Sequence, residues 1–277
     1  MPLKLMYITN NTEVALIAEK YGVNRIWVDL EKLGKEERQH GLNTVKSNHT
    51  IQDVVKIKSV LTTSELLVRI NCWNKNSKNE IENVIAAGAD VIMLPMWKKL
   101  EEVQSFIHAV NNRAKTVLLL ETKEAEQCLD LVLECCCPDE IHIGLNDLHL
   151  SYGLKFMFEL LANGTVERIC DKLKKTNIPY GFGGIAKIGQ GMLPAEKILL
   201  EHYRLGSTRV ILSRSFCDTS IIKDMSEIEQ TFKNNLKELR EAEIYACNAD
   251  KQTLEKNTED IKICVQKVVE NVTSRKN

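Results

Sequence analysis

Ionisable residues stand at or just beyond the ends of four short apolar runs in this sequence. The four segments are Val28-Asp29-Leu30-Glu31, Val68-Arg69-Ile70-Asn71, Leu119-Leu120-Glu121 and Gly144-Leu145-Asn146-Asp147. A single segment of this kind is adequately explained as the solvated end of a strand. Because all four share the pattern, we expect their polar side chains to meet in one functional site.

Glu121 and Asp147 are the candidate metal ligands. Two carboxylates from neighbouring strands, with water and substrate oxygens completing an octahedron, suit Mg²⁺ or Mn²⁺. The sequence has no His/Cys cluster with zinc-site spacing. Arg69 carries the planar fork that holds a carboxylate at two points. A divalent cation and an arginine facing one pocket would stabilise a developing enolate or alkoxide beside a carboxylate.

Other catalytic chemistries find weaker support. A Schiff base needs a desolvated lysine, and only Lys4 lies within a strand candidate, whereas Lys98, Lys99 and Lys123 are expected at helix starts. His142 lies within a strand candidate and is interpreted as a satisfied core histidine. The absence of a Gly-x-Ser-x-Gly elbow and of a P-loop disfavours serine hydrolases and NTPases.

A glycine-rich segment, Gly181-Phe182-Gly183-Gly184-Ile185-Ala186, fits the dinucleotide-binding pattern. It follows the seventh strand candidate rather than the first, and Pro194 delays the next helix, so we reject a dinucleotide site. Gly183 and Gly184 are instead expected to line the pocket, where backbone N–H groups can approach a carboxylate or carbonyl. Ser213-Arg214-Ser215 is a second, weaker candidate for anion binding.

The elements that must position these residues alternate between strand and helix along the chain. Helical stripes such as Val103, Phe106, Ile107 and Val110 separate apolar runs that lack alternation, as strands buried on both faces do. Eight strand-then-helix units predict an α/β fold, a (β/α)8 TIM barrel, with an open doubly wound sheet as the alternative. The strand candidates are Leu3–Ile8, Arg25–Asp29, Leu66–Ile70, Val91–Leu94, Thr116–Leu120, Glu140–Ile143, Tyr180–Phe182 and Arg209–Leu212.

The barrel is expected to occupy residues 1–223, with the active site at the C-terminal ends of its strands. Residues 224–277 are highly charged and are expected to form extra C-terminal helices. One helix would complete the barrel, and the other would pack on it or in a subunit interface, so we expect a homo-oligomer. The apolar stripes of this extension are Ile228, Phe232, Leu236 and Leu239, then Ile261, Cys264, Val265 and Val268.

Composition narrows the class of protein further. The 277 residues are 44% hydrophobic and 27% charged, with a formal net charge of −1. This composition is ordinary for a globular protein, and the near-zero charge gives no general attraction to nucleic acid or anionic lipid. The apolar runs are far shorter than the roughly 20 residues of a membrane helix. The N-terminus lacks signal-peptide features, and the nine cysteines do not form a disulfide framework. We expect a cytoplasmic protein that acts on a small molecule.

In their order along the chain, these segments resemble the HpcH/HpaI aldolase and citrate lyase β-subunit family. The resemblance covers about residues 20–215 and implies a pyruvate/phosphoenolpyruvate-type barrel that depends on Mg²⁺ or Mn²⁺ and breaks a carbon–carbon bond. It also implies that Glu121 and Asp147 hold the metal and that Arg69 binds a keto acid. Besides the four segments already named, it rests on Gly88-Ala89-Asp90-Val91-Ile92-Met93-Leu94-Pro95-Met96 and Glu121-Thr122-Lys123-Glu124-Ala125.

Two positions depart from the family pattern. Lys32 stands where the HpaI-like aldolases have a histidine base and where the citrate lyase side has an acidic residue. Leu119 stands where the HpaI-like aldolases carry a glutamine. Proton transfer is therefore assigned to Lys32, or else to Glu31 or a metal-bound water, with Asp29 orienting the group that acts. Of these alternatives we favour Glu31 and water.

The sequence thus predicts a metal-dependent, aldolase-like carbon–carbon lyase acting on a 2-keto acid or related carboxylate through a metal-stabilised enolate. A citrate lyase-like acyl-CoA lyase and a non-catalytic barrel that binds a keto acid are the alternatives. The expected catalytic residues are Arg69, Glu31, Asp29 and Lys32. The expected substrate-binding residues are Arg69, Asn71, Gly144, Leu145, Asn146, Gly183 and Gly184.

Overall fold

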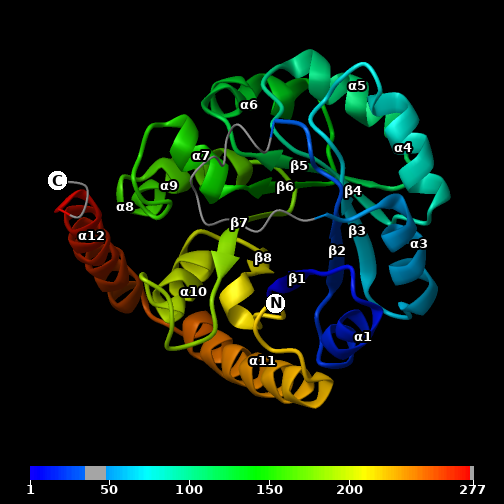
Figure 1. Ribbon diagram of the computed structural model, residues 1–277. Helices are drawn as coiled ribbons and strands as arrows, with labels where there is room; N and C mark the ends of the chain where they lie inside the picture. The colour runs from blue at the N-terminus through cyan, green and yellow to red at the C-terminus, as the bar shows by residue number, and fades with distance from the viewer. Residues whose placement is uncertain (35–47, 275–277) are drawn as a thin grey trace.

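A computed structural model describes residues 1–34 and 48–274 of the chain. Its strands form one closed parallel barrel in which the order in space is the order in sequence (Figure 1). This confirms the predicted (β/α)8 TIM barrel and excludes an open doubly wound sheet. The strands are β1 (Lys4–Ile8), β2 (Arg25–Asp29), β3 (Glu65–Arg69), β4 (Val91–Leu94), β5 (Lys115–Leu120), β6 (Glu140–Ile143), β7 (Tyr180–Ile185) and β8 (Arg209–Leu212).

The strand bounds follow the apolar runs closely, with one instructive exception. β2, β4, β6 and β8 begin and end at the expected residues. β7 runs to Ile185, three residues beyond the expected end at Phe182, and its register against β8 shifts between Gly181 and Gly184. Glycine has a low strand propensity, so the last part of this strand carries no apolar signal.

The helices of the described residues surround the barrel (Figure 1). None of them is long and apolar enough to cross a membrane, a statement limited to residues 1–34 and 48–274. They are α1 (Thr12–Lys20), α3 (Ile51–Val60), α4 (Ser77–Ala86), α5 (Leu100–Val110), α6 (Lys123–Cys135), α7 (Leu145–Ser151), α8 (Glu159–Ala162), α9 (Thr165–Leu173), α10 (Ala195–Arg204), α11 (Met225–Cys247) and α12 (Lys251–Ser274).

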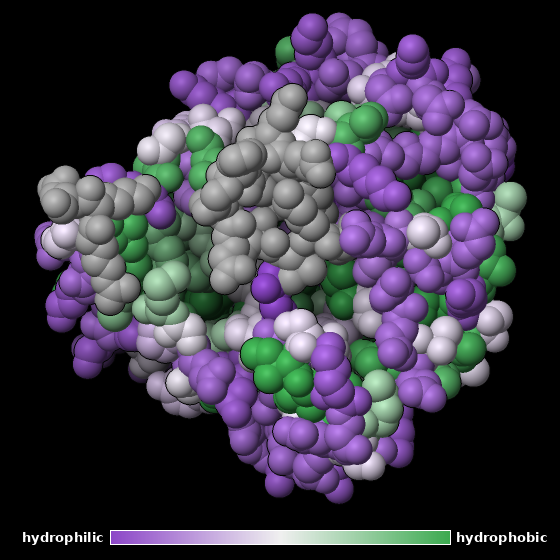
Figure 2. Space-filling view, in the orientation of Figure 1, coloured by the Kyte–Doolittle hydropathy of each residue, from purple (hydrophilic) through white to green (hydrophobic). Residues whose placement is uncertain are grey.

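The outer helices cover the barrel through apolar stripes. On α5, Val103, Phe106 and Val110 are buried, and Ile107 packs against the same core. The opposite face of such a helix is free for polar residues, and the faces of α4 and α5 seen in Figure 2 are mainly hydrophilic. The main core therefore lies between the helices and the outer surface of the strands.

The two C-terminal helices occupy the flank of the barrel opposite α4 (Figure 1). α11 packs against α1 and α10, and α12 packs against α8 and α10. Ile261 and Val265 of α12 are buried, and the side-chain amide of Asn257 donates to the Glu201 carboxylate on α10 at 3.1 Å. The stripe of α12 is thus covered by the same chain, and a homo-oligomer stays a prediction.

The base of the barrel interior holds charged side chains, which we call the basal ion network. Glu140 accepts paired hydrogen bonds from Arg25, at 2.5 and 2.7 Å, and from Arg209, at 2.6 and 2.8 Å. Arg25 also binds Glu65 at 2.7 Å, and Glu65 in turn binds Lys115. Above the network, apolar side chains such as Met6, Leu67 and Val117 fill the barrel.

Candidate active site

A cavity of about 520 Å³ lies at the C-terminal ends of the strands. This is the end of a (β/α)8 barrel at which active sites are built. The fold therefore brings together most of the residues that the sequence singled out. Those that line the cavity are Asp29, Arg69, Glu121, Gly144, Leu145, Asn146, Asp147, Gly183 and Gly184.

Asp29 and Arg69 form a buried ion pair in which the guanidinium grips the carboxylate at two points. Arg69 Nε lies 2.9 Å from Asp29 Oδ1, and Nη2 lies 2.9 Å from Oδ2. Glu31 Oε2 lies 3.3 Å from the same Nη2, and its side chain is only 2% exposed. The end of β2 thus supplies two carboxylates that hold the arginine at the end of β3.

The surroundings of Arg69 stabilise its charged form. Burial lowers the pKa of Arg69, but the charges of Asp29 and Glu31 outweigh this effect and leave the pKa above its ordinary value. The guanidinium also lies over the ring of Trp27, 5.1 Å from the ring centroid. The guanidinium plane is thus fixed in the lining of the cavity, where an arginine can present a donor to an oxygen atom of a ligand.

Asn71 and Lys32 take different places from those of the cavity residues. Asn71 Oδ1 accepts hydrogen bonds from the backbone N–H groups of Lys32, at 2.8 Å, and Leu33, at 2.9 Å. Its amide nitrogen donates to Glu80 on α4 at 2.8 Å, and burial raises the pKa of Glu80. Lys32 itself is exposed. Asn71 therefore positions the segment after β2. Lys32 contacts Asn71 through its backbone N–H, and its side chain is not a buried amine.

His49 lies beside the end of β2. The backbone N–H of Asp29 donates to His49 Nδ1 at 3.0 Å, and the histidine is 8% exposed. An Nδ1 that accepts a hydrogen bond is unprotonated, so the remaining proton of the neutral ring is on Nε2. His49 thus helps to fix the backbone from which the Asp29 carboxylate projects.

Glu121 is held at the end of β5 by the backbone around it. Its side chain is 2% exposed, and Oε1 accepts the backbone N–H of Met96 at 3.1 Å. Met96 has a φ of 53°, which is uncommon for a residue with a side chain. A Cβ atom at Gly144 would lie 2.8 Å from Glu121 Oε2, so only glycine leaves room for this carboxylate.

Asp147 lies in the first turn of α7 and is 9% exposed. It lines the same cavity as Glu121, so the fold brings the two proposed metal ligands to one site. In residues 1–34 and 48–274 no group of three or more His, Cys, Asp and Glu side chains could hold a metal ion. Glu121 and Asp147 offer two carboxylates, and Mg²⁺ is commonly bound by one or two carboxylates together with waters and substrate oxygens.

The glycine-rich segment forms one wall of the cavity. Gly183 has a φ of 53°, and a Cβ atom there would lie 2.7 Å from Leu145 Cδ1. The next helix along the chain begins only at Ala195, with Pro194 as its N-cap, so the glycines do not open a helix as those of a dinucleotide-binding turn do. Ser213 and Arg214, the weaker anion candidates, also line the cavity.

The cavity floor contains two residues whose role the sequence interpretation missed, Trp27 and His142. Both line the cavity, and they are 2% and 1% exposed. His142 Nε2 lies 3.1 Å from the carbonyl oxygen of Gly183. The sequence predicted a core histidine whose nitrogens are hydrogen-bonded, and this contact satisfies one of the two. The sequence could have placed Trp27 at the cavity, because it stands two residues before Asp29 and side chains two apart on a strand face the same side.

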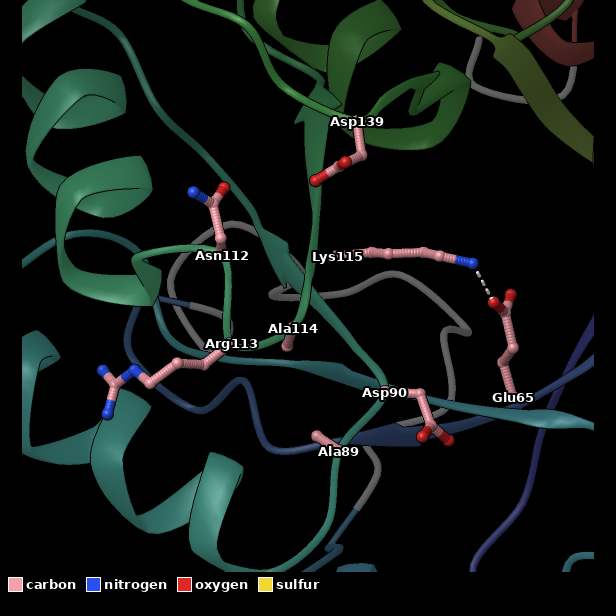
Figure 3. Close-up of a pocket in the computed structure, with 8 residues that line it drawn as sticks. All are labelled: Glu65, Ala89, Asp90, Asn112, Arg113, Ala114, Lys115 and Asp139. Carbon is pink, nitrogen blue, oxygen red and sulfur yellow. Dashed lines mark hydrogen bonds and ion pairs between the residues drawn. The ribbon is translucent and has the colours of Figure 1, made fainter.

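A second hollow, of about 490 Å³, lies at the opposite end of the barrel (Figure 3). Its charged residues already have protein partners: Lys115 pairs with Glu65, and Asp90 binds Lys58 and the backbone N–H of Leu66. Asp139 likewise accepts from the backbone and hydroxyl groups of Thr116. These contacts join neighbouring strands and account for the charges without a ligand.

Comparisons with known proteins agree with this architecture. No family model matches the chain, and no curated protein matches it. Among solved structures, an HpcH/HpaI aldolase from Desulfitobacterium hafniense DCB-2 is similar with a TM-score of 0.60 and 13% sequence identity. The match covers 87% of this chain and 93% of that one. The chain therefore has the barrel fold of an HpcH/HpaI aldolase, the family that its strand-end motifs resemble.

Proposed function

We propose that this protein is an aldolase-like carbon–carbon lyase that uses Mg²⁺ or Mn²⁺ to cleave a 2-keto acid or a related carboxylate. The observation that carries the proposal is the joint position of Glu121, Asp147 and Arg69 on one cavity at the catalytic end of the barrel. The structural similarity to an HpcH/HpaI aldolase supports the same reaction class.

Glu121 and Asp147 are the residues that would hold the metal ion. Their carboxylate oxygens are the ligands that Mg²⁺ and Mn²⁺ prefer, and the missing side chain at Gly144 leaves space next to Glu121 Oε2. Bound there, the ion would act as a Lewis acid that polarises the oxygen atoms of a keto acid. Oxygens of the substrate and of water would complete the coordination.

Arg69 would bind the carboxylate of the substrate. Asp29 and Glu31 occupy Nε and Nη2 of the guanidinium, which fixes its plane over Trp27 and leaves Nη1 as the donor toward the ligand. Because the arginine is already ordered, little side-chain entropy is lost when a carboxylate binds.

Glu31 is the residue we assign to proton transfer. In a retro-aldol step the hydroxyl proton of the substrate goes to a base, the carbon–carbon bond breaks, and its electron pair stays on the pyruvate half until a proton quenches it. Glu31 is buried against Arg69, whereas the Lys32 side chain is exposed. Glu31 is thus a buried carboxylate next to the cavity-lining Arg69, from where it would take the proton.

A non-catalytic barrel that binds a keto acid is the second candidate. Leu119 favours it, because this apolar side chain is 2% exposed and lines the cavity directly beside the position of His142 on the next strand. An apolar wall at this point offers no hydrogen bond to a reacting group. Binding without turnover would be the expected behaviour of such a protein.

Incubation with Mn²⁺ and a panel of 4-hydroxy-2-keto acids, with pyruvate release followed by a coupled assay, tests the proposal. Wild-type protein should release pyruvate, and Glu121→Gln should not. Glu124→Gln, which changes an exposed carboxylate of α6, is the matched control and should stay active. Pyruvate binding without release from any acid favours the non-catalytic barrel. Cleavage of an acyl-CoA adduct alone would identify the acyl-CoA lyase instead.

A further inference from the structure

Two nitrogen atoms at the cavity floor have no hydrogen-bond partner within the part of the chain that the structure describes. They are Trp27 Nε1 and His142 Nδ1, and both belong to side chains that line the cavity. Buried polar groups in folded proteins are nearly always hydrogen-bonded, so each exception needs an explanation. Because both side chains line the cavity, a bound ligand is the candidate for the missing partner of each nitrogen.

The hydrogen bond of His142 with Gly183 determines which nitrogen is protonated. A carbonyl oxygen only accepts hydrogen bonds, so His142 Nε2, 3.1 Å from the Gly183 oxygen, must carry a proton. Burial lowers the pKa of His142 to about 4, which keeps the ring neutral near pH 7. In a neutral ring with a proton on Nε2, Nδ1 is a hydrogen-bond acceptor.

Trp27 and His142 face each other across the barrel axis. They lie in one layer with Met93 and Ile211, formed by the inward side chains of the even-numbered strands β2, β4, β6 and β8. The indole N–H is a donor only, and His142 Nδ1 is an acceptor only. The floor therefore presents one donor and one acceptor in an otherwise apolar layer.

We propose that the cavity floor binds a hydroxyl group of the ligand, to which the Trp27 indole donates a hydrogen bond and from which His142 Nδ1 accepts one. A hydroxyl is the small uncharged group that both donates and accepts. A charged group would be poorly stabilised here, because the floor is apolar and its two polar atoms are neutral. Trp27 and His142 are thus specificity-determining residues.

This inference rests on the proposed function, because Arg69 lies over the Trp27 ring and is assigned to the substrate carboxylate. A ligand whose carboxylate meets Arg69 would have its neighbouring carbons close to Trp27, because Arg69 lies over the Trp27 ring. The assignment therefore selects, among keto acids, those that carry a hydroxyl group close to the keto acid unit.

Calorimetric binding of pyruvate and 3-hydroxypyruvate in the presence of Mn²⁺ tests the assignment, because the two acids differ only by the hydroxyl. Wild-type protein should bind 3-hydroxypyruvate about three- to tenfold more tightly, the preference expected from neutral hydrogen bonds. In His142→Phe and Trp27→Phe this ratio should fall to about one. His108→Phe, at an exposed histidine of α5, is the control and should keep the preference.

A second measurement on unmodified protein covers the case in which a variant fails to fold. In ¹⁵N NMR of histidine-labelled protein, the Nδ1 resonance of His142 should report an unprotonated nitrogen and should shift on addition of 3-hydroxypyruvate but not of pyruvate. Binding of both acids with equal affinity and no such shift means that an ordered water alone satisfies the floor, and overturns the assignment. Failure of wild-type protein to bind either acid overturns the proposed function as well.

Discussion

Asp29 holds Arg69 by two hydrogen bonds of 2.9 Å, one to Nε and one to Nη2. The planar fork of the arginine is therefore directed at a carboxylate of its own chain. The sequence interpretation assigned that fork to a substrate carboxylate, but Asp29 occupies it, so under the proposed function the substrate would be bound by Nη1. Asp29 sets the plane and position of Arg69 and would act on a substrate only through it.

Replacement of Arg69 by lysine tests this arrangement. An ammonium cannot bind Asp29 at two points and present a further donor in a fixed plane. Arg69→Lys should weaken binding of oxalate or pyruvate about tenfold or more, measured calorimetrically. Arg113→Lys alters an exposed arginine paired with Glu82 and should leave the affinity unchanged. Equal oxalate affinity in Arg69→Lys would contradict the assignment.

Glu121 and Asp147 are expected to be required for metal binding. Glu121→Gln and Asp147→Asn should each abolish Mn²⁺ binding in calorimetry while circular dichroism shows an intact fold. Gly144→Ala should weaken Mn²⁺ binding about tenfold or more, because the new Cβ would lie 2.8 Å from Glu121 Oε2. The exposed Glu124→Gln is the control, and unchanged metal affinity in both amide variants would exclude this site.

Substitutions of Glu31 and Lys32 should have different effects on proton transfer. Lys32 is exposed and Glu31 is buried against Arg69, so Lys32→Met should stay active and Glu31→Gln should lose about 100-fold or more of its turnover. The measurement is a pH–rate profile of pyruvate release for both variants. An inactive Lys32→Met together with a fully active Glu31→Gln would assign the base to the lysine.

His142 and His202 should make the protein lose stability on mild acidification. Burial lowers their pKa values to about 4 and about 3, below the ordinary value of 6.5. The unfolded chain then binds protons that the folded chain does not, so stability is complete above about pH 6.5 and falls as the pH drops toward 4, by up to about 1.4 kcal/mol per pH unit for each histidine. Urea unfolding between pH 7 and 4 measures this slope. His202→Asn should reduce it, and His108→Asn, at an exposed position, should not.

Glu140 should govern stability at lower pH. Despite its burial, hydrogen bonds from Arg25 and Arg209 lower the pKa of Glu140 to about 2, from an ordinary 4.5. A carboxylate with a lowered pKa stabilises the fold above about pH 4.5, and this contribution is lost as the pH falls toward 2. Glu140→Gln should cost about 3–5 kcal/mol at pH 7, because it removes the carboxylate that two buried arginines share. Arg25 keeps a second carboxylate partner, Glu65. A loss below 1 kcal/mol in urea unfolding would show that the network is not coupled to stability.

Much of the barrel could be predicted because a buried parallel strand reads as a short apolar run. The four apolar residues Val91–Leu94 are enough by themselves to predict β4. β3 and β5 begin at Glu65 and Lys115, one residue earlier than expected, and an ion pair between these two charged residues, which only the folded barrel brings together, holds the two strand starts. Local composition cannot show a partner that is distant in sequence.

The site was predictable to the extent that the strand ends define it. Asp29, Arg69, Glu121 and Asp147 needed only the rule that active sites lie at the C-terminal ends of barrel strands. The structural role of Asn71 could not be predicted from the sequence. Its side chain binds the backbone N–H groups of Lys32 and Leu33, and such a contact depends on how two loops meet. For the same reason nothing in the sequence marks Glu80 as the support of Asn71.

The basal ion network has a consequence for how the barrel folds. Glu140 is separated by 115 residues from Arg25 and by 69 residues from Arg209, yet it pairs with both, and Glu65 supplies a second negative charge to Arg25. A partly closed sheet would bury some of these charges before their partners arrive, so intermediates with several strands in place are disfavoured. Closure of the first strands on the last and neutralisation of the interior then occur together, which favours all-or-none folding. A cut between β4 and β5 would remove the network contacts that join the two halves, Arg25–Glu140 and Glu65–Lys115, so the separate halves should gain stable structure only when combined.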